Sequence, residues 1–312
     1  MARILVTTDY LRPGDEVDTL LRKHGHHVTY KPSSGPRQRA DALALFDDID
    51  GAIVASEPIT AEMLSHADAL KVIARSGVGY DSIDTAAAAA RGIRVCNTPG
   101  VNHDAVAELT IALMLMAARR LTTIVDGVRG GRWPRDAGHE LRGATLGIVG
   151  YGPSGRAVAH LAAAFGMTVL VNTGHADPAS TGVQFVDRNT VIAAADYLSL
   201  HTRSDPSAHR IIGPAALKAM KTTAVLINTA RGSLVDEDAL ADALLAGQIA
   251  GAALDVVDIE PLPASSRLRG LDNVIITSHL AGQTVEARSR AGLAAAHAVI
   301  DVLDGREPTH PV

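Results

Sequence analysis

The chain has 312 residues, of which 47% are hydrophobic and 20% are charged, and its formal net charge is -5. This composition is typical of a folded globular protein and excludes a disordered chain. The mild acidity argues against nucleic acid as a partner, because nucleic-acid-binding proteins usually carry a clustered basic surface. The length exceeds the range over which one core usually grows, so we predict two domains.

The only cysteine, Cys96, excludes an intrachain disulfide and fits a reducing compartment. We interpret it as a small buried apolar residue. The N-terminus enters a β-type run directly, without the pattern of a signal peptide. The longest apolar run, 105–118, is shorter than the ~20 residues that a membrane span needs. We therefore expect a cytoplasmic protein that binds no membrane.

Short β-type runs alternate with alanine-rich helical segments along the chain, which predicts parallel sheets with helices on both faces. This alternation of strands and helices occurs in two separate sets along the chain. The first set of predicted strands covers residues 4–7, 27–30, 51–55, 71–74 and 94–96, and the second covers 145–149, 168–172, 197–201, 224–228, 250–256 and 274–277. Six strands with intervening helices match the two halves of a Rossmann domain.

Two long helical segments join these sets. We predict one continuous helix over 102–129 and a final helix over 285–304 that returns to the N-terminal domain. The predicted fold is therefore α/β with two doubly wound parallel-sheet domains. A Rossmann dinucleotide-binding domain, 99–283, is inserted into a flavodoxin-like substrate domain, 1–98 and 284–312. We expect a ligand cleft beside the two crossings between them.

A glycine-rich segment, GYGPSG at 150–155, follows the first strand of the second set and opens a helix. Gly150 permits the tight turn, Gly152 lets the backbone approach a pyrophosphate, and Gly155 lets helix and strand pack closely. Because a strand precedes the segment and a helix follows it, we predict a bound dinucleotide rather than a structural turn.

The residue that usually distinguishes NAD from NADP is missing. A Rossmann domain normally has an acidic residue about 20 positions after the loop, which binds the ribose hydroxyls. Here Asn172, Thr173 and Gly174 occupy that place, and the next carboxylate is Asp177. No arginine stands in this segment either. We therefore predict NAD or NADP as the cofactor, and the choice stays open.

Three further segments each follow a strand of the second set. They read NTARGSLVD at 228–236, LDVVDIEP at 254–261 and TSHLAG at 277–282. In open parallel sheets, groups just beyond the carboxyl ends of the strands converge on the ligand crevice. Arg231, Glu260 and His279 are therefore candidate catalytic residues. Taken singly, each also fits a structural role, as a surface arginine, a loop carboxylate and one of 13 histidines.

Together with the glycine loop, these segments resemble the D-isomer-specific 2-hydroxyacid dehydrogenases. The resemblance covers nearly the whole chain and adds, in order, SGVGYD at 76–81, NTPG at 97–100 and AVAE at 105–108. It implies an NAD(P)-dependent oxidoreductase that moves a hydride between the cofactor and C2 of a small D-2-hydroxy or 2-oxo acid. Ser278 departs from the proline that is common before the family's histidine, but this change removes no proton-transfer group.

The resemblance also implies a role for each catalytic residue. Arg231 would bind the substrate carboxylate and polarise its carbonyl, a task that suits a planar, permanently charged guanidinium. His279 would pass the proton, since imidazole both donates and accepts protons near neutral pH. Glu260 would orient the ring and stabilise the imidazolium. Asp258 is a rival partner for the ring, although the alternation of an extended segment turns it away.

The other implied contacts divide between substrate and cofactor. The substrate residues are Arg75, Ser76, Val78 and Gly79. Arg75 either binds a second anionic group of the substrate or acts as a structural arginine. The cofactor residues are Thr110, Gly150, Gly152, Pro153, Ser154, Gly155, Asn172, Thr173, His201, Thr202, Thr229, Ala230, Asp255 and Gly282. We predict no metal site.

The main alternative function is a non-catalytic NAD(H)-sensing regulator of the corepressor type, which shares the fold and the three catalytic residues. The chain lacks the long disordered tails of such regulators, which favours the enzyme. The resemblance further suggests a homodimer built around the helix 102–129. We predict that Trp133 packs in a core or an interface rather than against the cofactor.

Overall fold

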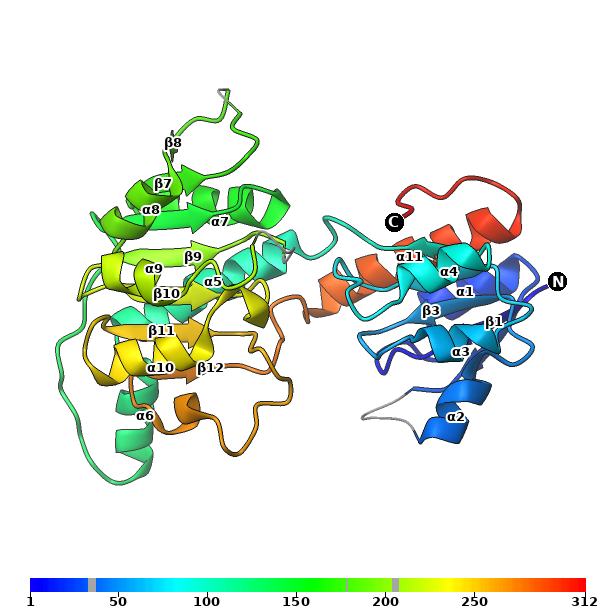
Figure 1. The fold of residues 1–312 in the computed structure, drawn as a ribbon, viewed down its shortest axis with the longest axis horizontal. Coiled ribbons are helices and arrows are strands. Elements are labelled where there is room, and N and C mark those ends of the chain that lie inside the picture. The colour runs from blue at the N-terminus through cyan, green and yellow to red at the C-terminus, as the bar shows by residue number, and fades with distance from the viewer. Residues whose placement is uncertain (33–37, 178, 204–207) are drawn as a thin grey trace. The chain divides into compact units, whose positions relative to one another are not determined.

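The computed structural model describes residues 1–32, 38–177, 179–203 and 208–312, and these form two compact units (Figure 1). The first unit comprises Met1–Asn102 and Gln283–Val312, and the second comprises His103–Gly282. Each unit contains one parallel sheet. The predicted fold class, α/β with two doubly wound parallel sheets, is confirmed.

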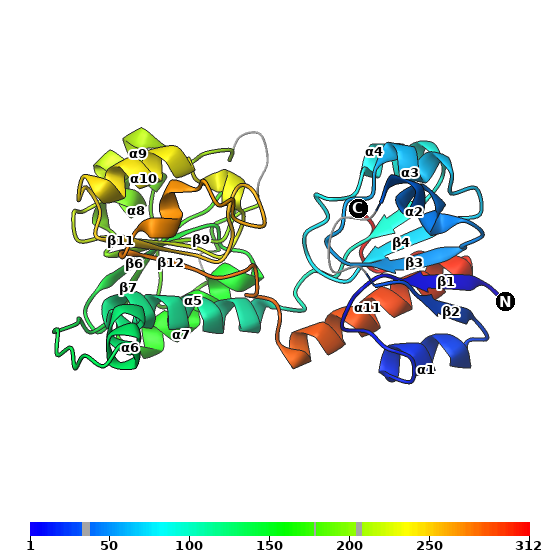
Figure 2. The ribbon, with the colours of Figure 1, turned by 90° about the horizontal axis from the view of Figure 1, so that it is seen from below.

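The first unit has a five-stranded sheet in the order β2-β1-β3-β4-β5, which is the flavodoxin-like order. The strands are β1 (Arg3–Val6), β2 (His27–Tyr30), β3 (Gly51–Val54), β4 (Val72–Arg75) and β5 (Arg94–Cys96). One face is covered by α1 (Glu16–Lys23) and α11 (Val285–Leu303), and the other by α2 (Arg39–Leu43), α3 (Ala61–Ser65), α4 (Thr85–Ala90) and the 3-10 turn η1 (Ala44–Phe46) (Figure 2). The final helix thus packs on the first unit, as predicted.

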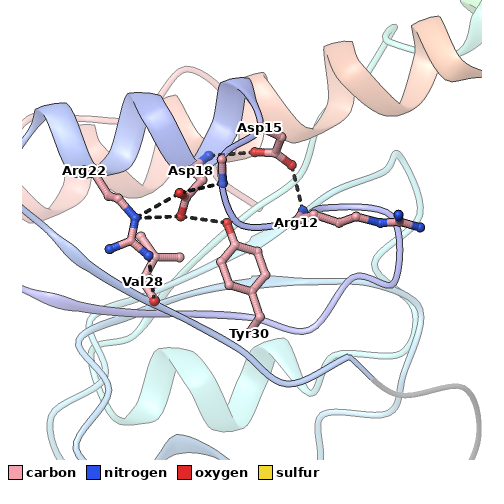
Figure 3. Close-up of polar contacts among 7 residues, drawn as sticks. Arg12, Asp15, Asp18, Arg22, Val28 and Tyr30 are labelled. Carbon is pink, nitrogen blue, oxygen red and sulfur yellow. Dashed lines mark hydrogen bonds and ion pairs between the residues drawn. The ribbon is translucent and has the colours of Figure 1, made fainter.

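A buried carboxylate fixes α1 against β2 in this unit (Figure 3). Asp15 caps the helix by accepting the backbone N–H of Asp18 at 2.8 Å. Asp18 is a buried residue, and its carboxylate accepts the Arg22 Nε–H at 2.9 Å and the Tyr30 hydroxyl at 3.0 Å. Burial and the hydrogen bond to Asp18 raise the pKa of Tyr30. The hydrogen bonds offset the cost of burying the charge, so the cluster has a structural role.

The second unit has a seven-stranded sheet in the order β12-β11-β10-β9-β6-β7-β8. The strands are β6 (Thr145–Val149), β7 (Thr168–Asn172), β8 (Gln184–Phe185), β9 (Tyr197–Leu200), β10 (Val225–Asn228), β11 (Gly251–Leu254) and β12 (Val274–Ile276). The sheet lies between α5 (His103–Ala118) and α7 (Pro153–Ala164) on one face and α8 (Arg188–Ala194), α9 (Pro214–Ala219) and α10 (Glu237–Leu245) on the other (Figure 2). All six predicted strands are present. The edge strand β8 was not predicted, because two residues are too few to show an alternating pattern.

The predicted continuous helix over 102–129 is wrong. The structure has two helices, α5 and α6 (Leu121–Arg129). The Ala118 carbonyl accepts the backbone N–H of His139, at 2.8 Å, instead of continuing the helical ladder. Arg120 then takes a left-handed conformation, with φ of 50°, and the chain turns into α6. A residue from a distant loop therefore ends the first helix.

Trp133 lies after α6, and its side chain is 79% exposed. The indole therefore packs in no core of the second unit, and the other half of the prediction, packing in an interface, stays a prediction. The segment 130–144, which contains Trp133, runs without a helix or strand before β6. In the described parts of the chain, no helix is long and apolar enough to cross a lipid bilayer.

Candidate active site

The three candidate catalytic residues follow adjacent strands of the second sheet. Arg231 follows β10, Glu260 follows β11 and His279 follows β12, and these strands are neighbours in the order β12-β11-β10. All three side chains therefore project from loops at the carboxyl edge of one sheet. This edge is where ligands bind in open parallel sheets.

A hydrogen bond joins two of them. His279 Nδ1 lies 2.8 Å from Glu260 Oε2. Burial alone would raise the pKa of Glu260, but the hydrogen bond and charge of His279, the Val257 N–H and the charge of Arg231 outweigh it and lower the pKa. The carboxylate thus stays ionised and holds Nδ1, so Nε2 is the nitrogen that can exchange a proton with a substrate. The rival carboxylate of Asp258 belongs to an exposed residue, whose own backbone N–H donates to Glu237.

A buried carboxylate holds the loop that carries His279. Asp255, 1% exposed, accepts the Thr277 hydroxyl at 2.6 Å and the backbone N–H groups of Leu280 at 2.9 Å and Ala281 at 2.8 Å. The His279 N–H donates to the Asp255 carbonyl at 2.8 Å. His279 itself is left-handed, with φ of 55°, a conformation that costs energy for a residue with a Cβ atom. Asp255 therefore keeps the histidine in a strained position.

Arg231 is positioned by a tight turn after β10. The side-chain amide of Asn228 donates to the Arg231 carbonyl at 2.8 Å. At the next residue, Gly232, a Cβ atom would collide with the backbone of Val257. Glycine at this position therefore lets the loop that carries Arg231 pack closely against the segment that leads to Glu260. The positive charge of Arg231 is one of the causes that lower the pKa of Glu260.

The glycine loop fits a pyrophosphate. A Cβ atom on Gly150 would collide with the His201 carbonyl, and one on Gly155 would collide with the Gly150 carbonyl, so both places require glycine. A Cβ atom on Gly152, the N-cap of α7, would meet only open space. The helix therefore begins at a close-packed turn with room in front of its N-terminus, where phosphate groups bind. Pro153 and Ser154 form its first turn.

His201 supports this loop from the end of β9. Its Nε2 lies 2.8 Å from the Ser199 hydroxyl. Burial lowers the pKa of His201 to about 4, so the imidazole is neutral at pH 7. The backbone N of the next residue, Thr202, lies against Gly150. These predicted cofactor residues thus shape the loop and add no charge to it.

The end of β7 carries no charged group, as the sequence indicates. The Asn172 carbonyl accepts the Gly150 N–H at 2.8 Å, so this strand end lies beside the glycine loop. The structure adds a cation that the sequence segment lacks. Arg156 of α7 reaches Asp177, beyond Thr173, with 3.4 Å between Nη1 and Oδ2. The sequence gives one signal for it, since Arg156 directly follows the glycine loop.

Two of the predicted cofactor residues, Thr110 and Thr229, are buried and lie close together. Thr110 is fully buried, and its hydroxyl donates to the Val106 carbonyl at 2.8 Å. It also lies 3.1 Å from the hydroxyl of Thr229, which is 8% exposed. These side chains join α5 to the end of β10. The backbone N–H of Ala230, another predicted cofactor residue, donates to Asn228 Oδ1 at 3.0 Å and so serves the turn itself.

The predicted substrate loop lies in the first unit, after β4. The Arg75 guanidinium donates to the carbonyl of Ser76 at 2.8 Å. The side chain of Asn97 donates to the Val78 carbonyl at 2.7 Å. Ser76 is buried, and Gly79 is half-buried in the same loop. Arg75 thus braces the loop in which it stands.

Tyr10 connects this loop to α11. Its hydroxyl lies 2.6 Å from Ser76 Oγ, and the Arg288 guanidinium lies 4.9 Å from the centre of its ring. Burial raises the pKa of Tyr10, while the charges of Arg75 and Arg288 oppose this effect. Two cations therefore lie near one hydroxyl at this end of the first sheet.

The family model described as D-isomer specific 2-hydroxyacid dehydrogenase, NAD binding domain, matches residues 111–281. The chain belongs to this family. A glyoxylate reductase of Thermofilum pendens is 38% identical over 292 residues, which cover 90% of this chain and 86% of the relative. A hydroxypyruvate reductase of Thermotoga maritima is 35% identical over 298 residues, which cover 94% of this chain and 96% of the relative.

Solved structures agree with this assignment. The match to the crystal structure of the TT0316 protein from Thermus thermophilus covers 99% of both chains, with a TM-score of 0.92 and 40% identity. This chain is therefore an NAD(P)-dependent D-2-hydroxyacid dehydrogenase that transfers a hydride between the cofactor and a 2-hydroxy or 2-oxo acid. The regulator of the corepressor type gains no support, since the curated relatives named above are described as enzymes.

Proposed function

We propose that this dehydrogenase reduces small 2-oxo acids, with His279 as the proton donor. The observation that carries the proposal is the 2.8 Å hydrogen bond between His279 Nδ1 and Glu260 Oε2, on loops adjacent to that of Arg231. A histidine paired with a carboxylate is fixed in one tautomer and is stabilised when protonated. That combination suits a general acid near neutral pH.

Each residue has a defined task in this scheme. The first unit, with the Arg75 loop, serves as the substrate domain, and the second unit binds the cofactor. When bound, the nicotinamide supplies the hydride. Arg231 binds the substrate carboxylate through its two parallel N–H donors. His279 then donates its proton to the oxygen on C2, and Glu260 stabilises the imidazolium before that transfer.

Glyoxylate and hydroxypyruvate are the first substrates that we propose, because the curated relatives described above are reductases of these acids. Arg75 and Arg288, grouped around Tyr10, also favour acids with a second anionic group. We place the enzyme in the cytoplasm, since a single buried cysteine fits a reducing compartment.

We propose a homodimer as the working form. Leu121, Val125 and Val128 lie on one face of α6 at helical spacing and are 41%, 43% and 45% exposed. Trp133 follows at 79% exposure. An apolar stripe of this kind fits a second copy of the chain. Trp133→Asp should then lower the mass measured by light scattering to that of a monomer, whereas Val285→Asp, at a side chain 80% exposed in the first unit, should not.

The test of the function is a panel of 2-oxo acids offered with NADH and with NADPH, monitored by loss of the reduced-cofactor absorbance. We expect turnover of glyoxylate or hydroxypyruvate, and Arg231→Lys should raise KM because lysine lacks the bidentate geometry. Arg267→Lys, at an exposed arginine elsewhere in the second unit, is the matched control. Binding of cofactor without turnover of any acid would contradict the proposal and favour a sensing role.

A further inference from the structure

Arg156 lies between the glycine loop and the segment after β7. Its guanidinium carbon is 4.7 Å from the centre of the Tyr151 ring, and that ring packs edge-on against Phe185 of β8 at 5.4 Å. Arg156 Nη1 is 3.4 Å from Asp177 Oδ2 and 3.4 Å from Ser180 Oγ. A fixed aromatic surface therefore supports the guanidinium while its donors face the segment that follows β7.

This place is where a Rossmann domain contacts the adenosine ribose. The group at the end of the second strand meets the ribose 2′ position, and β7 is that strand here. The helix that carries Arg156 binds the pyrophosphate at its N-terminus. The Gly150 N–H donates to the Asn172 carbonyl at 2.8 Å, which ties the two segments together. Arg156 thus spans the two segments that flank the ribose.

The carboxylate of Asp177 is the anionic group that Arg156 binds in the structure. It accepts hydrogen bonds from Arg156, from the Ser180 hydroxyl at 3.3 Å and from the Ala179 N–H at 3.0 Å. The Arg156 and Asp177 side chains are 46% and 45% exposed. Exposed ion pairs are weak. A phosphate group, which carries more charge and more acceptor oxygens than a carboxylate, suits a guanidinium better.

We propose that Arg156 selects between the two nicotinamide cofactors by binding the 2′-phosphate of NADP in exchange for Asp177. The uncharged residues Asn172, Thr173 and Gly174 neither repel that phosphate nor bind the diol of NAD as a carboxylate would. With NAD bound, Arg156 keeps its ion pair with Asp177. The proposal rests on cofactor binding by the family and is independent of the role given to His279.

The test measures binding rather than turnover. Dissociation constants for 2′,5′-ADP and 5′-AMP are determined by calorimetry, and those for NADPH and NADH by cofactor fluorescence. We expect Arg156→Gln to weaken binding of the two 2′-phosphorylated ligands by ~10- to 100-fold, the loss of one charge-assisted contact. Binding of 5′-AMP and NADH should change by less than about threefold. Arg156→Lys should retain part of the preference, because it keeps the charge.

Asp177→Asn should act in the opposite direction. It removes the carboxylate that competes for Arg156, so 2′,5′-ADP should bind more tightly in this variant and not in the double variant with Arg156→Gln. The matched controls are Arg267→Gln and Asp242→Asn, which each remove one charge from an exposed ion pair of 2.6 Å elsewhere in the same unit. Both control variants should leave the ratio of the affinities for 2′,5′-ADP and 5′-AMP unchanged.

Three results would overturn the proposal. If Arg156→Gln weakens the binding of 2′,5′-ADP and of 5′-AMP equally, the substitution has only disturbed the glycine loop. If Asp177→Asn selectively weakens the binding of NADH, Asp177 is the acceptor for the ribose hydroxyls. Equal affinity for 2′,5′-ADP and 5′-AMP, in both the unaltered protein and Asp177→Asn, would show that no 2′-phosphate reaches Arg156.

Discussion

The carboxylate of Asp255 accepts the backbone N–H of Leu280, the residue directly after His279, at 2.9 Å. Together with its bonds to Thr277 and Ala281, this contact fixes both sides of a histidine that has left-handed backbone geometry. The family resemblance assigns Asp255 to the cofactor. The structure gives its carboxylate a second task, which is to position the proton donor.

Asp255→Asn should therefore lower both stability and kcat. Asparagine offers one acceptor oxygen, and its amino group would face backbone N–H donors that lose their partner. An unsatisfied buried group costs about 1–3 kcal/mol, and we expect a decrease in Tm and a fall in kcat of ~10-fold or more. Asp258→Asn, which removes the same charge from an exposed neighbour, should change neither quantity. Unchanged kcat and Tm in Asp255→Asn would remove the positioning role.

The pH profile tests the pairing of Glu260 with His279. Hydroxy acid oxidation requires the neutral imidazole, so kcat/KM falls on the acid side, and oxo acid reduction requires the imidazolium, so kcat/KM falls on the basic side. Glu260→Gln removes the carboxylate that stabilises the imidazolium. Both limbs should then move to lower pH. Because the pKa of Glu260 is lowered, the unaltered enzyme should keep this pairing well into the acid range. Identical profiles for the two proteins would exclude Glu260 from the mechanism.

His201 should make stability depend on pH. An unfolded histidine takes up its proton near pH 6.5, whereas burial lowers the pKa of His201 to about 4 in the fold. Between these values the unfolded state binds more protons, so stability falls as pH decreases. His201→Gln should reduce the loss of unfolding free energy between pH 7 and pH 4.5 by roughly 1–3 kcal/mol. His160→Gln, at an exposed position of α7, is the control. The unfolding free energy of the three proteins is measured by denaturant titration at each pH. If it changes equally with pH in all three, the His201 ring is protonated freely in the fold.

Substrate preference tests the two roles considered for Arg75. If it binds a second anion, Arg75→Ala should lower kcat/KM for a dianionic 2-oxo acid by roughly 10- to 150-fold and leave glyoxylate nearly unchanged. If its main task is the 2.8 Å hydrogen bond to Ser76, kcat/KM should fall equally for both substrates. Arg91→Ala, at another arginine of the first unit, should affect neither. The ratio of the two kcat/KM values therefore decides between these tasks.

Local sequence signals predict the scaffold well, and contacts between distant residues account for what they miss. The strand, glycine loop and helix around Gly150 are contiguous, so their pattern is visible in the sequence. The break between α5 and α6 depends on a hydrogen bond from His139, which lies outside the helix. The pairing of Arg156 with Asp177 and the left-handed backbone of His279 likewise arise only when separate loops meet.

The most direct test of the account is the effect of His279→Ala on turnover and on cofactor affinity, measured on the same preparation. We predict that kcat for reduction of the best 2-oxo acid falls by ~10² to 10⁴, the usual effect of removing a general acid. The dissociation constant for the reduced cofactor should stay within about threefold, because the glycine loop is untouched. A variant that keeps kcat within about tenfold of the unaltered enzyme, with cofactor still bound, would contradict the assignment of His279 as the proton donor.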